Sequence, residues 1–221
     1  MILQKFIVSY KYLNYVSFNA QVLWSVNYLK KIAKKNKIQV KLNKLNKDLK
    51  SDYIYLFDDI EKLKSTFNVT ANLPLNTEAF AILPHGNNII IYANDYRGFV
   101  YAITEIVDII KYYKNNNLVI EKKIIEKPTT KIRSISKCFE SIDEDKEWFY
   151  NKNSWDEYLT LLISERFNRF TLTLGMQYNY PYGNEFIKDV YLYLPYPFIV
   201  SPKGFKIKLS NFSEKERSKN L

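Results

Sequence analysis

The sequence predicts an α+β domain over residues 1–127 and, over residues 128–221, the first units of an incomplete (β/α)8 barrel. Two observations support this division. The second part has the order strand, helix, strand, which is the building block of parallel sheets and barrels. Fewer than about 100 residues follow Pro128, whereas a complete barrel takes about 250. We therefore expect a small antiparallel or mixed sheet with two helices, followed by an unfinished barrel.

The first half of the α+β domain contains three predicted strands. Residues 5–10, 38–42 and 53–57 are rich in β-branched and aromatic side chains, which favours strands. A helix lies between the first two strands, because apolar residues recur there at three- and four-residue steps. These residues are Phe18, Val22, Val26, Leu29 and Ala33. The spacing of Asp58 and Glu61 indicates the cap of a short additional helix that runs to residue 67.

The second half of this domain begins with a predicted hairpin. Two apolar strands, residues 78–83 and 89–92, flank a turn that contains Pro84, His85 and Gly86. Asn94 and Asp95 then open a helix, whose apolar stripe consists of Phe99, Ala102, Ile106, Ile110 and Tyr113. Residues 118–125 are the last predicted strand of the domain.

The barrel part begins with a predicted strand over residues 131–139. Ser154 and Glu157 have the spacing of a capping box, which predicts a helix with an apolar stripe of Trp155, Tyr158, Leu159, Leu162, Ile163 and Phe167. Residues 169–175 are the next strand. A second capping box at Ser213 and Glu216 predicts a further helix close to the end of the sequence.

The composition is that of a globular protein, with 47% hydrophobic and 16% aromatic residues. The formal net charge of +10 is compatible with an anionic partner such as nucleic acid. The chain is also rich in Asn, Ile and Tyr, which share A- and T-rich codons with Lys, so a general compositional bias explains the charge equally simply. We favour that bias, and nucleic acid is not the predicted partner.

Targeting and redox signals are sparse. The N-terminus lacks the apolar core of a signal peptide, and the longest apolar stretch, residues 99–110, contains Glu105 and Asp108. We therefore predict a cytoplasmic protein without a membrane partner. The single cysteine, Cys138, excludes an internal disulfide and is predicted to be a packed strand residue.

Phosphate-binding and metal-binding motifs are absent from the sequence. The five glycines are isolated from one another, so there is no glycine-rich phosphate loop. His85 is the only histidine and is predicted to be a turn residue. The sequence therefore predicts neither a cofactor nor a metal, and it assigns no catalytic residue.

Candidate binding residues follow the two barrel strands. Residues at the carboxyl ends of barrel strands face the active site, and Glu140 and Asp143 follow the first strand. Gln177, Tyr178 and Tyr180 follow the next strand, where aromatic faces can stack on a sugar ring. We predict Glu140, Gln177, Tyr178 and Tyr180 as substrate contacts. The alternatives are a merely solvated acidic loop and aromatic rings that pack in the core.

Several of these residues together resemble a known family. The Glu78-Ala-Phe strand, the hairpin, and the helix with Arg97, Gly98, Tyr101 and Glu105 resemble the N-terminal accessory domain of β-hexosaminidases and α-glucuronidases, of glycoside hydrolase families 20 and 67. Pro128, Arg133 and Ser134 are similar to the start of the first barrel strand in those enzymes. Residues 155–169 resemble the first barrel helix and its approach to the second strand. Ser134 and Ala102 replace glycines that are common in that family.

The resemblance implies hydrolysis of O-glycosyl bonds by the parent enzyme and a carbohydrate partner. Because the catalytic carboxylates of these families lie on later barrel strands, it assigns none to this chain, and we predict no turnover by residues 1–221 alone. The resemblance further implies that Arg97 and Gly98 begin a helix rather than bind sugar. Two other functions remain as alternatives, a basic nucleic-acid-binding α/β module and a non-catalytic carbohydrate-binding or structural domain.

Overall fold

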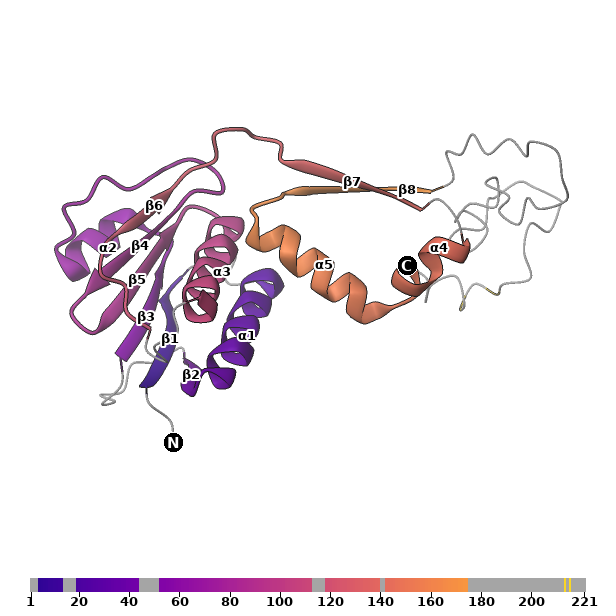
Figure 1. Ribbon diagram of the computed structural model, residues 1–221. Coiled ribbons are helices and arrows are strands. Elements are labelled where there is room, and N and C mark those ends of the chain that lie inside the picture. Colours follow the sequence, from indigo (N-terminus) through magenta and orange to yellow (C-terminus); the bar gives the residue numbers. More distant parts are fainter. Residues whose placement is uncertain are drawn as a thin grey trace, which may run out of the picture. The chain divides into compact units, whose positions relative to one another are not determined.

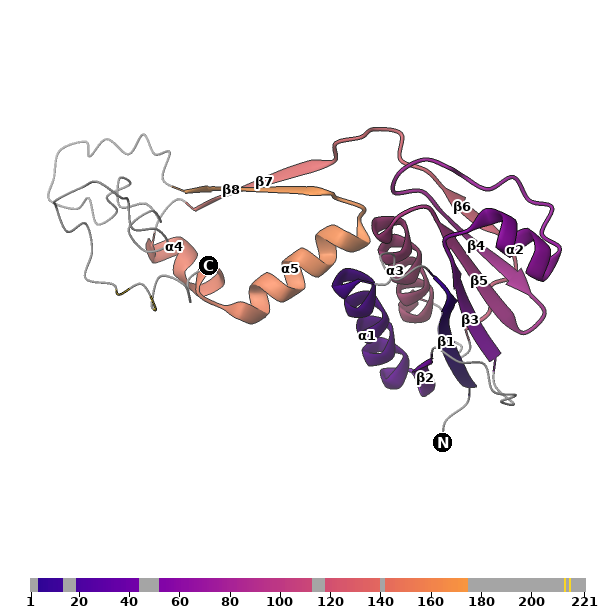
Figure 2. The same cartoon turned by 180° about the vertical axis from the view of Figure 1, so that it is seen from behind.

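The computed structural model describes residues 4–13, 19–43, 52–112, 118–139, 142–174, 213 and 215. It divides into two compact units (Figures 1 and 2). The first unit comprises Met1–Lys131 together with Ile163–Arg166, and the second comprises Ile132–Leu162 and Phe167–Leu221. The predicted capping box near the end of the sequence lies almost entirely outside the described residues.

The first unit is built on a six-stranded sheet with the order β2-β1-β3-β5-β4-β6. The strands are β1 (Gln4–Tyr12), β2 (Ile38–Asn43), β3 (Asp52–Phe57), β4 (Phe80–His85), β5 (Asn88–Ala93) and β6 (Ile124–Glu126). The neighbours from β2 to β5 pair in parallel, and β4 pairs antiparallel with both β5 and β6. The prediction of a mixed sheet is confirmed, but the sheet is mostly parallel, since a helical crossover returns the chain to the same end of the sheet.

Within the described residues, three helices cover this sheet: α1 (Ala20–Lys35), α2 (Ile60–Phe67) and α3 (Tyr96–Tyr112). The two predicted main helices are α1 and α3, and α2 is the short additional helix that was predicted to end at residue 67. In Figures 1 and 2, α1 and α3 lie side by side on one face of the sheet and α2 lies on the other. The unit is thus a mixed α/β structure with helices on both faces of a sheet.

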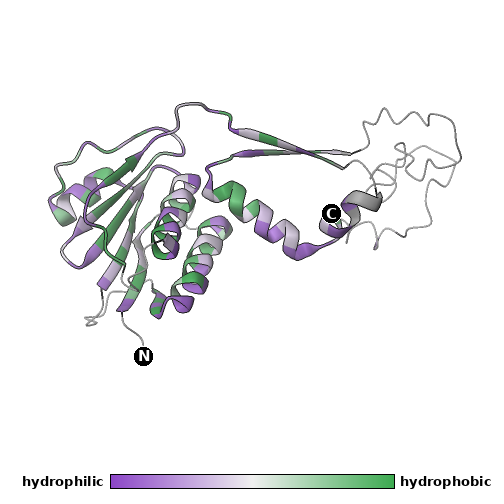
Figure 3. Ribbon diagram, viewed as in Figure 1, coloured by the Kyte–Doolittle hydropathy of each residue, from purple (hydrophilic) through white to green (hydrophobic). Residues whose placement is uncertain are grey.

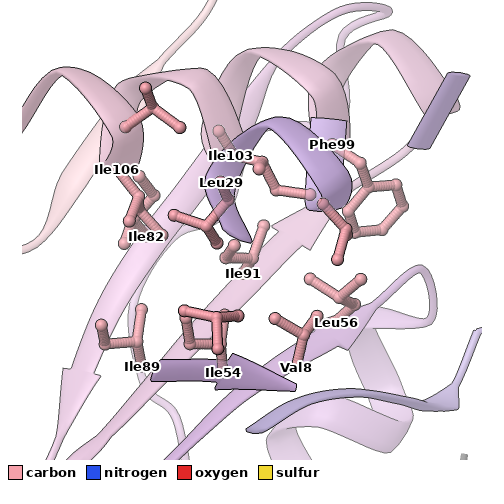
Figure 4. Packing of buried hydrophobic residues seen from close by; sticks show 14 of the residues in the cluster. Val8, Leu29, Ile54, Leu56, Ile82, Ile89, Ile91, Phe99, Ile103 and Ile106 are labelled. Atoms are coloured by element: carbon pink, nitrogen blue, oxygen red, sulfur yellow. The ribbon is translucent and has the colours of Figure 1, made fainter. Parts of the chain in front are cut away.

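Successive residues of the central strands enter two different cores. Val8, Ile54 and Ile91 pack beneath α1 and α3 together with Leu29 and Phe99 (Figure 4). Their neighbours Ile7, Tyr55 and Tyr92 pack on the other face with Leu63 of α2. This division follows from the period of two of a strand, and it explains why β3 and β5 are buried at five of their six positions. Figure 3 shows hydrophobic residues in these strands. Strands buried on both faces are typical of parallel sheets between helical layers.

The cap of α2 differs by one residue from the prediction, whereas α3 opens at Asp95 as predicted. Asp59, and not Asp58, caps α2, where its Oδ1 accepts hydrogen bonds from the N–H groups of Glu61 and Lys62 at 2.9 and 3.0 Å. Asn19 caps α1 in the same way, with both distances 3.1 Å. An N-cap must immediately precede the first helical residue in an extended conformation, and Asp59 and Asn19 both meet this requirement.

The segment that follows α3 is less regular than predicted. Leu118 and Ile120 are buried, but only Ile124–Glu126 of the predicted strand over residues 118–125 pairs with β4. The Leu118 N–H donates to Gln4 Oε1 at 2.7 Å, and Gln4 Nε2 donates to the Leu118 carbonyl at 3.2 Å. A side-chain amide of β1 therefore replaces the missing backbone ladder at this position.

The second unit contains β7 (Ser134–Phe139), α4 (Ile142–Phe149), α5 (Lys152–Ser164) and β8 (Arg169–Leu174). β7 and β8 pair in parallel with Ser134 opposite Arg169, so the predicted strand, helix, strand order is present. The capping box at Ser154 is wrong, because Asn151 Oδ1 accepts from the N–H groups of Asn153 and Ser154 and α5 starts earlier. Within the described residues, no helix has both the length and the apolar character that a membrane crossing requires.

Candidate functional site

The residues that carry the family resemblance in the first unit form a structural junction. Asp95 accepts two backbone hydrogen bonds, from the N–H of Glu78 at 2.7 Å and from the N–H of Gly98 at 2.8 Å. Arg97 Nη1 donates to Glu78 Oε1 at 2.7 Å, and this hydrogen bond raises the pKa of Arg97. Glu78 has a left-handed backbone with a φ of 65°. These contacts fasten the segment before β4 to the start of α3.

Gly98 lies at the tightest point of this junction. A Cβ atom at this position would stand 2.5 Å from the Ala79 carbonyl oxygen and 2.8 Å from the Ala93 Cβ. No side chain larger than hydrogen fits there without displacement of α3, because non-bonded carbon atoms attract best at about 3.5–4.0 Å. Arg97 and Gly98 lie in the first turn of α3, so the prediction that they begin a helix is confirmed.

The two strands of the second unit have faces of different character. Lys137 and Phe170 point to the helical side, since the Lys137 Nζ lies 4.2 Å from the ring centroid of Trp148 and the Phe170 ring lies 5.9 Å from that of Trp155. Residues of the other alternation pair across the strands as Ser136 with Thr171 and Cys138 with Thr173. The face away from the helices is therefore lined by hydroxyl groups, one thiol and, where Ser134 pairs with Arg169, a guanidinium group.

That polar face corresponds to the interior in a (β/α) barrel, where the helices form the outer ring. Barrel interiors are dominated by branched apolar residues, but these two strands place Ser136 and Thr171 at such positions. Hydroxyl groups donate and accept hydrogen bonds, so they suit a polyhydroxylated ligand. Neither β7 nor β8 contains a carboxylate, and glycoside hydrolysis generally requires a pair of them. The described strands therefore offer binding groups and no general acid or base.

The segment after β7 is a helix that the sequence did not predict. α4 occupies most of the acidic stretch that was interpreted as a loop. Trp148 anchors it, because its ring lies 5.2 Å from that of Trp155 and its Nε1–H donates to Asp145 Oδ1 at 2.5 Å. The cation–π contact with Lys137 fixes the other side of Trp148 against β7. A firmly packed helix thus begins just after the carboxyl end of the strand.

The structure does not test the four residues that were predicted to contact a substrate. Glu140, Gln177, Tyr178 and Tyr180 lie outside the described residues, so the structure does not place them together or apart. Asp143 lies in α4 rather than in a loop. The polar face of β7 and β8 was missed, although the alternation of small polar and larger residues in the sequences SISKCF and RFTLTL was available as a signal.

The remaining candidate groups have local packing roles. His85 is the last residue of β4 and pairs with Asn88, so it is a strand residue beside the turn and not the predicted turn residue. Its ring packs edge-on against Phe67 with centroids 4.9 Å apart. Cys138 is a half-buried strand residue outside any disulfide. Among the described residues, no three His, Cys, Asp or Glu side chains gather in a way that would hold a metal ion.

The fold resembles that of solved carbohydrate-active enzymes. A family GH138 enzyme targeting pectin rhamnogalacturonan II matches 98% of this chain with a TM-score of 0.62 and 18% identity, over 22% of its own length. A family GH115 4-O-methyl-α-glucuronidase with specificity for decorated arabinogalactans matches 77% of this chain with a TM-score of 0.56 and 12% identity, over 25% of its length. The chain thus spans about a quarter or less of either enzyme.

Sequence comparisons add no family. No protein-family model matches the chain, and no curated protein matches its sequence. At these low identities the two solved structures show a shared fold, which is that of glycoside hydrolase domains. The nucleic-acid alternative gains no support, since Arg97, Gly98 and Phe99 lie in α3 and not in a strand, where RNA-recognition modules carry the corresponding aromatic motif.

Proposed function

We propose that this chain is the N-terminal part of a glycoside hydrolase. The first unit is its accessory domain, of the type that precedes the barrel in β-hexosaminidases and α-glucuronidases. The second unit supplies the first β-α-β unit of the catalytic barrel. The observation that supports this most strongly is the fold likeness over 98% of the chain to a much longer GH138 enzyme.

The proposed sugar contacts lie within β7 and β8 and beyond their carboxyl ends. Ser136 and Thr171 offer hydroxyl groups on the face away from α5, and Glu140, Gln177, Tyr178 and Tyr180 follow the strands in sequence. In parallel β/α structures, ligands bind at the carboxyl ends of the strands. Carboxyl, amide and aromatic groups at such a position suit hydrogen bonding to sugar hydroxyls and stacking on a pyranose face.

We expect turnover to require carboxylates beyond the two barrel strands that the structure describes. The described strands contain no carboxylate, and a glycosidase needs one group to protonate the leaving oxygen and another to act as nucleophile or base. We therefore expect residues 1–221 to bind carbohydrate without cleaving it. The proposed glycosidase activity belongs to a longer protein that continues the barrel.

Two measurements test this function. A panel of aryl glycosides is assayed with residues 1–221 and with the chain extended by the downstream coding sequence, and only the extended protein should release the aryl group. Cleavage by the 221-residue chain would refute the proposal that residues 1–221 bind carbohydrate without cleaving it. A glycan array then compares the chain with Tyr178→Ala, where binding should fall, and with Tyr112→Ala, an exposed tyrosine of α3 whose loss should leave binding unchanged.

A further inference from the structure

One side of α1 carries an outward stripe of two aromatic and two basic residues. The helix buries Val22, Val26, Leu29 and Ala33, and the stripe of Trp24, Tyr28, Lys31 and Lys35 recurs at steps of four, three and four residues on the opposite side. Trp24 is 36% exposed, Lys31 and Lys35 are exposed, and Tyr28 is half-buried. At 1.5 Å per residue the stripe runs for about 16 Å.

The charge around this stripe has a single sign. Residues 19–43 contain six lysines and no Asp, Glu or Arg; these lysines are Lys30, Lys31, Lys34, Lys35, Lys37 and Lys41. Within the described part of the chain, none of the six forms an ion pair, whereas Lys111 pairs with Asp108 and Lys152 with Asp156. Figure 3 shows the last turns of α1, next to β2, as hydrophilic. The positive charge is therefore concentrated on α1 and the edge strand β2.

The aromatic pair in the stripe, Trp24 and Tyr28, is held in place by a contact with α3. The ring of Trp24 stacks on that of Tyr28, with centroids 5.6 Å apart and an interplanar angle of 17°. The Lys111 Nζ lies 5.3 Å from the Tyr28 centroid and pairs with Asp108 at 3.0 Å. Because Tyr28 is fixed by α3, Trp24 presents its ring without a large loss of side-chain freedom on binding, which favours affinity.

We propose that this stripe, Trp24, Tyr28, Lys31 and Lys35, is a binding surface for an acidic polysaccharide. The pyranose faces of a polyuronate chain stack on Trp24, and its carboxylates pair with Lys31 and Lys35. The lysine cluster selects a polyanion by charge complementarity, and the choice of a sugar polymer rests on the proposed function. The surface belongs to the first unit, whereas the sugar contacts proposed beyond β7 and β8 belong to the second.

The side chains of the stripe fit a polyuronate better than a nucleic acid. Arginine is the residue that binds phosphate and guanine in a bidentate manner, and residues 19–43 contain none. Single-strand binding also relies on successive rings that stack on successive bases, whereas Trp24 and Tyr28 stack on each other. One exposed ring with flanking ammonium groups matches a chain in which sugar faces and carboxylates recur along the polymer.

The test uses the 221-residue chain and three polymers: polygalacturonate, its fully methyl-esterified form, which has the same backbone without charge, and poly(U) RNA. Dissociation constants are measured by isothermal titration calorimetry over a salt series. The variants are Trp24→Ala and the double variant Lys31→Gln/Lys35→Gln. The charge-matched control is Lys62→Gln/Lys64→Gln on α2, which lies on the other face of the sheet. Thermal unfolding confirms that each variant is folded.

We expect polygalacturonate to bind more tightly than its methyl ester, with an affinity that falls as salt rises. Trp24→Ala and the Lys31/Lys35 variant should each weaken binding about tenfold, as expected for one aromatic stack or two ion pairs, and the α2 control should bind like the unaltered chain. The proposal is overturned by tighter binding of poly(U), by equal losses in the α2 control, or by no binding of polygalacturonate. If the Tyr178-dependent glycan binding persists in any of these cases, the proposed function stands without the stripe.

Discussion

Gly98→Ala tests whether the junction between β4, β5 and α3 determines the stability of the first unit. The new methyl group would lie 2.5 Å from the Ala79 carbonyl oxygen and 2.8 Å from the Ala93 Cβ. Both neighbours are short and rigid, so α3 has to move and the 2.8 Å hydrogen bond from Gly98 to Asp95 lengthens. Overpacking of this kind costs about 1–3 kcal/mol, and the better helix propensity of alanine returns less than about 1 kcal/mol in a first turn.

We therefore expect a net loss of about 2 kcal/mol in the free energy of unfolding, or roughly 4–8 °C in Tm for a chain of this length. Urea denaturation followed by circular dichroism measures the first quantity, and calorimetry the second. Gly86→Ala is the control, because Gly86 has a φ of 56° but nothing within 4 Å of a Cβ, so only the cost of the left-handed backbone, about 1 kcal/mol, applies. A Gly98→Ala variant as stable as the unaltered chain would refute the steric argument.

Three further predictions follow from single contacts. The Glu78 side chain is 5% exposed and that of Arg97 is 45% exposed. Arg97→Ala removes the ion pair of a buried carboxylate and should cost about 3 kcal/mol, against about 1 kcal/mol for Glu78→Gln, which removes the charge itself. Equal losses in urea denaturation would contradict this asymmetry. Trp148→Ala should release α4 and make residues 140–150 at least about tenfold more sensitive to limited proteolysis, and an unchanged cleavage rate would rule out the anchoring role. Burial, and secondarily Asp58 and Asp59, raise the pKa of Tyr92 above its usual 10.0. The tyrosine therefore ionises at a lower pH in the unfolded chain than in the folded one, and the free energy of unfolding falls as the pH rises above about 10. Tyr92→Phe should reduce this alkaline loss of stability, measured by denaturation between about pH 9 and 11.

Strong periodicity made the helical layer of the first unit predictable. The four residues Val22, Val26, Leu29 and Ala33 of the predicted α1 stripe are all buried, and so are Phe99, Ala102, Ile106 and Ile110 of α3. An apolar stripe reports directly on the side of a helix that meets the sheet. The signal is local, and it does not depend on how distant strands pair.

The parallel pairing of the sheet was harder to predict. β3 and β5 pair side by side although β4 lies between them in sequence, and no local feature of either strand specifies a neighbour. The near-continuous apolar runs in β3 and β5 were the available sign, because strands buried on both faces favour a parallel arrangement between helices. The irregular segment at Leu118 was equally non-local, since its hydrogen-bonding partner is Gln4.

The helix α4 was missed for a different physical reason. Its acidic residues resemble a solvated loop, and the contacts that hold it come from Lys137 on β7 and Trp155 on α5. Tertiary contacts of this kind override weak local propensity. For the site itself, the sequence provided candidate residues beyond the strands. The alternation within each strand indicated a polar face, but only the register of β7 and β8 shows that Ser136 and Thr171 lie opposite each other.

The residues that carry the family resemblance are those that the packing of the first unit demands. Asp95 caps α3 and accepts a hydrogen bond from the backbone N–H of Glu78. Arg97 forms an ion pair with the buried Glu78 carboxylate, and Gly98 allows the close approach of α3 to Ala79. Because each is required by the fold, together they identify the architecture and leave the reaction open. Function on this scaffold is therefore best sought among residues that the packing leaves available, which are the polar face of β7 and β8 and the outward stripe of α1.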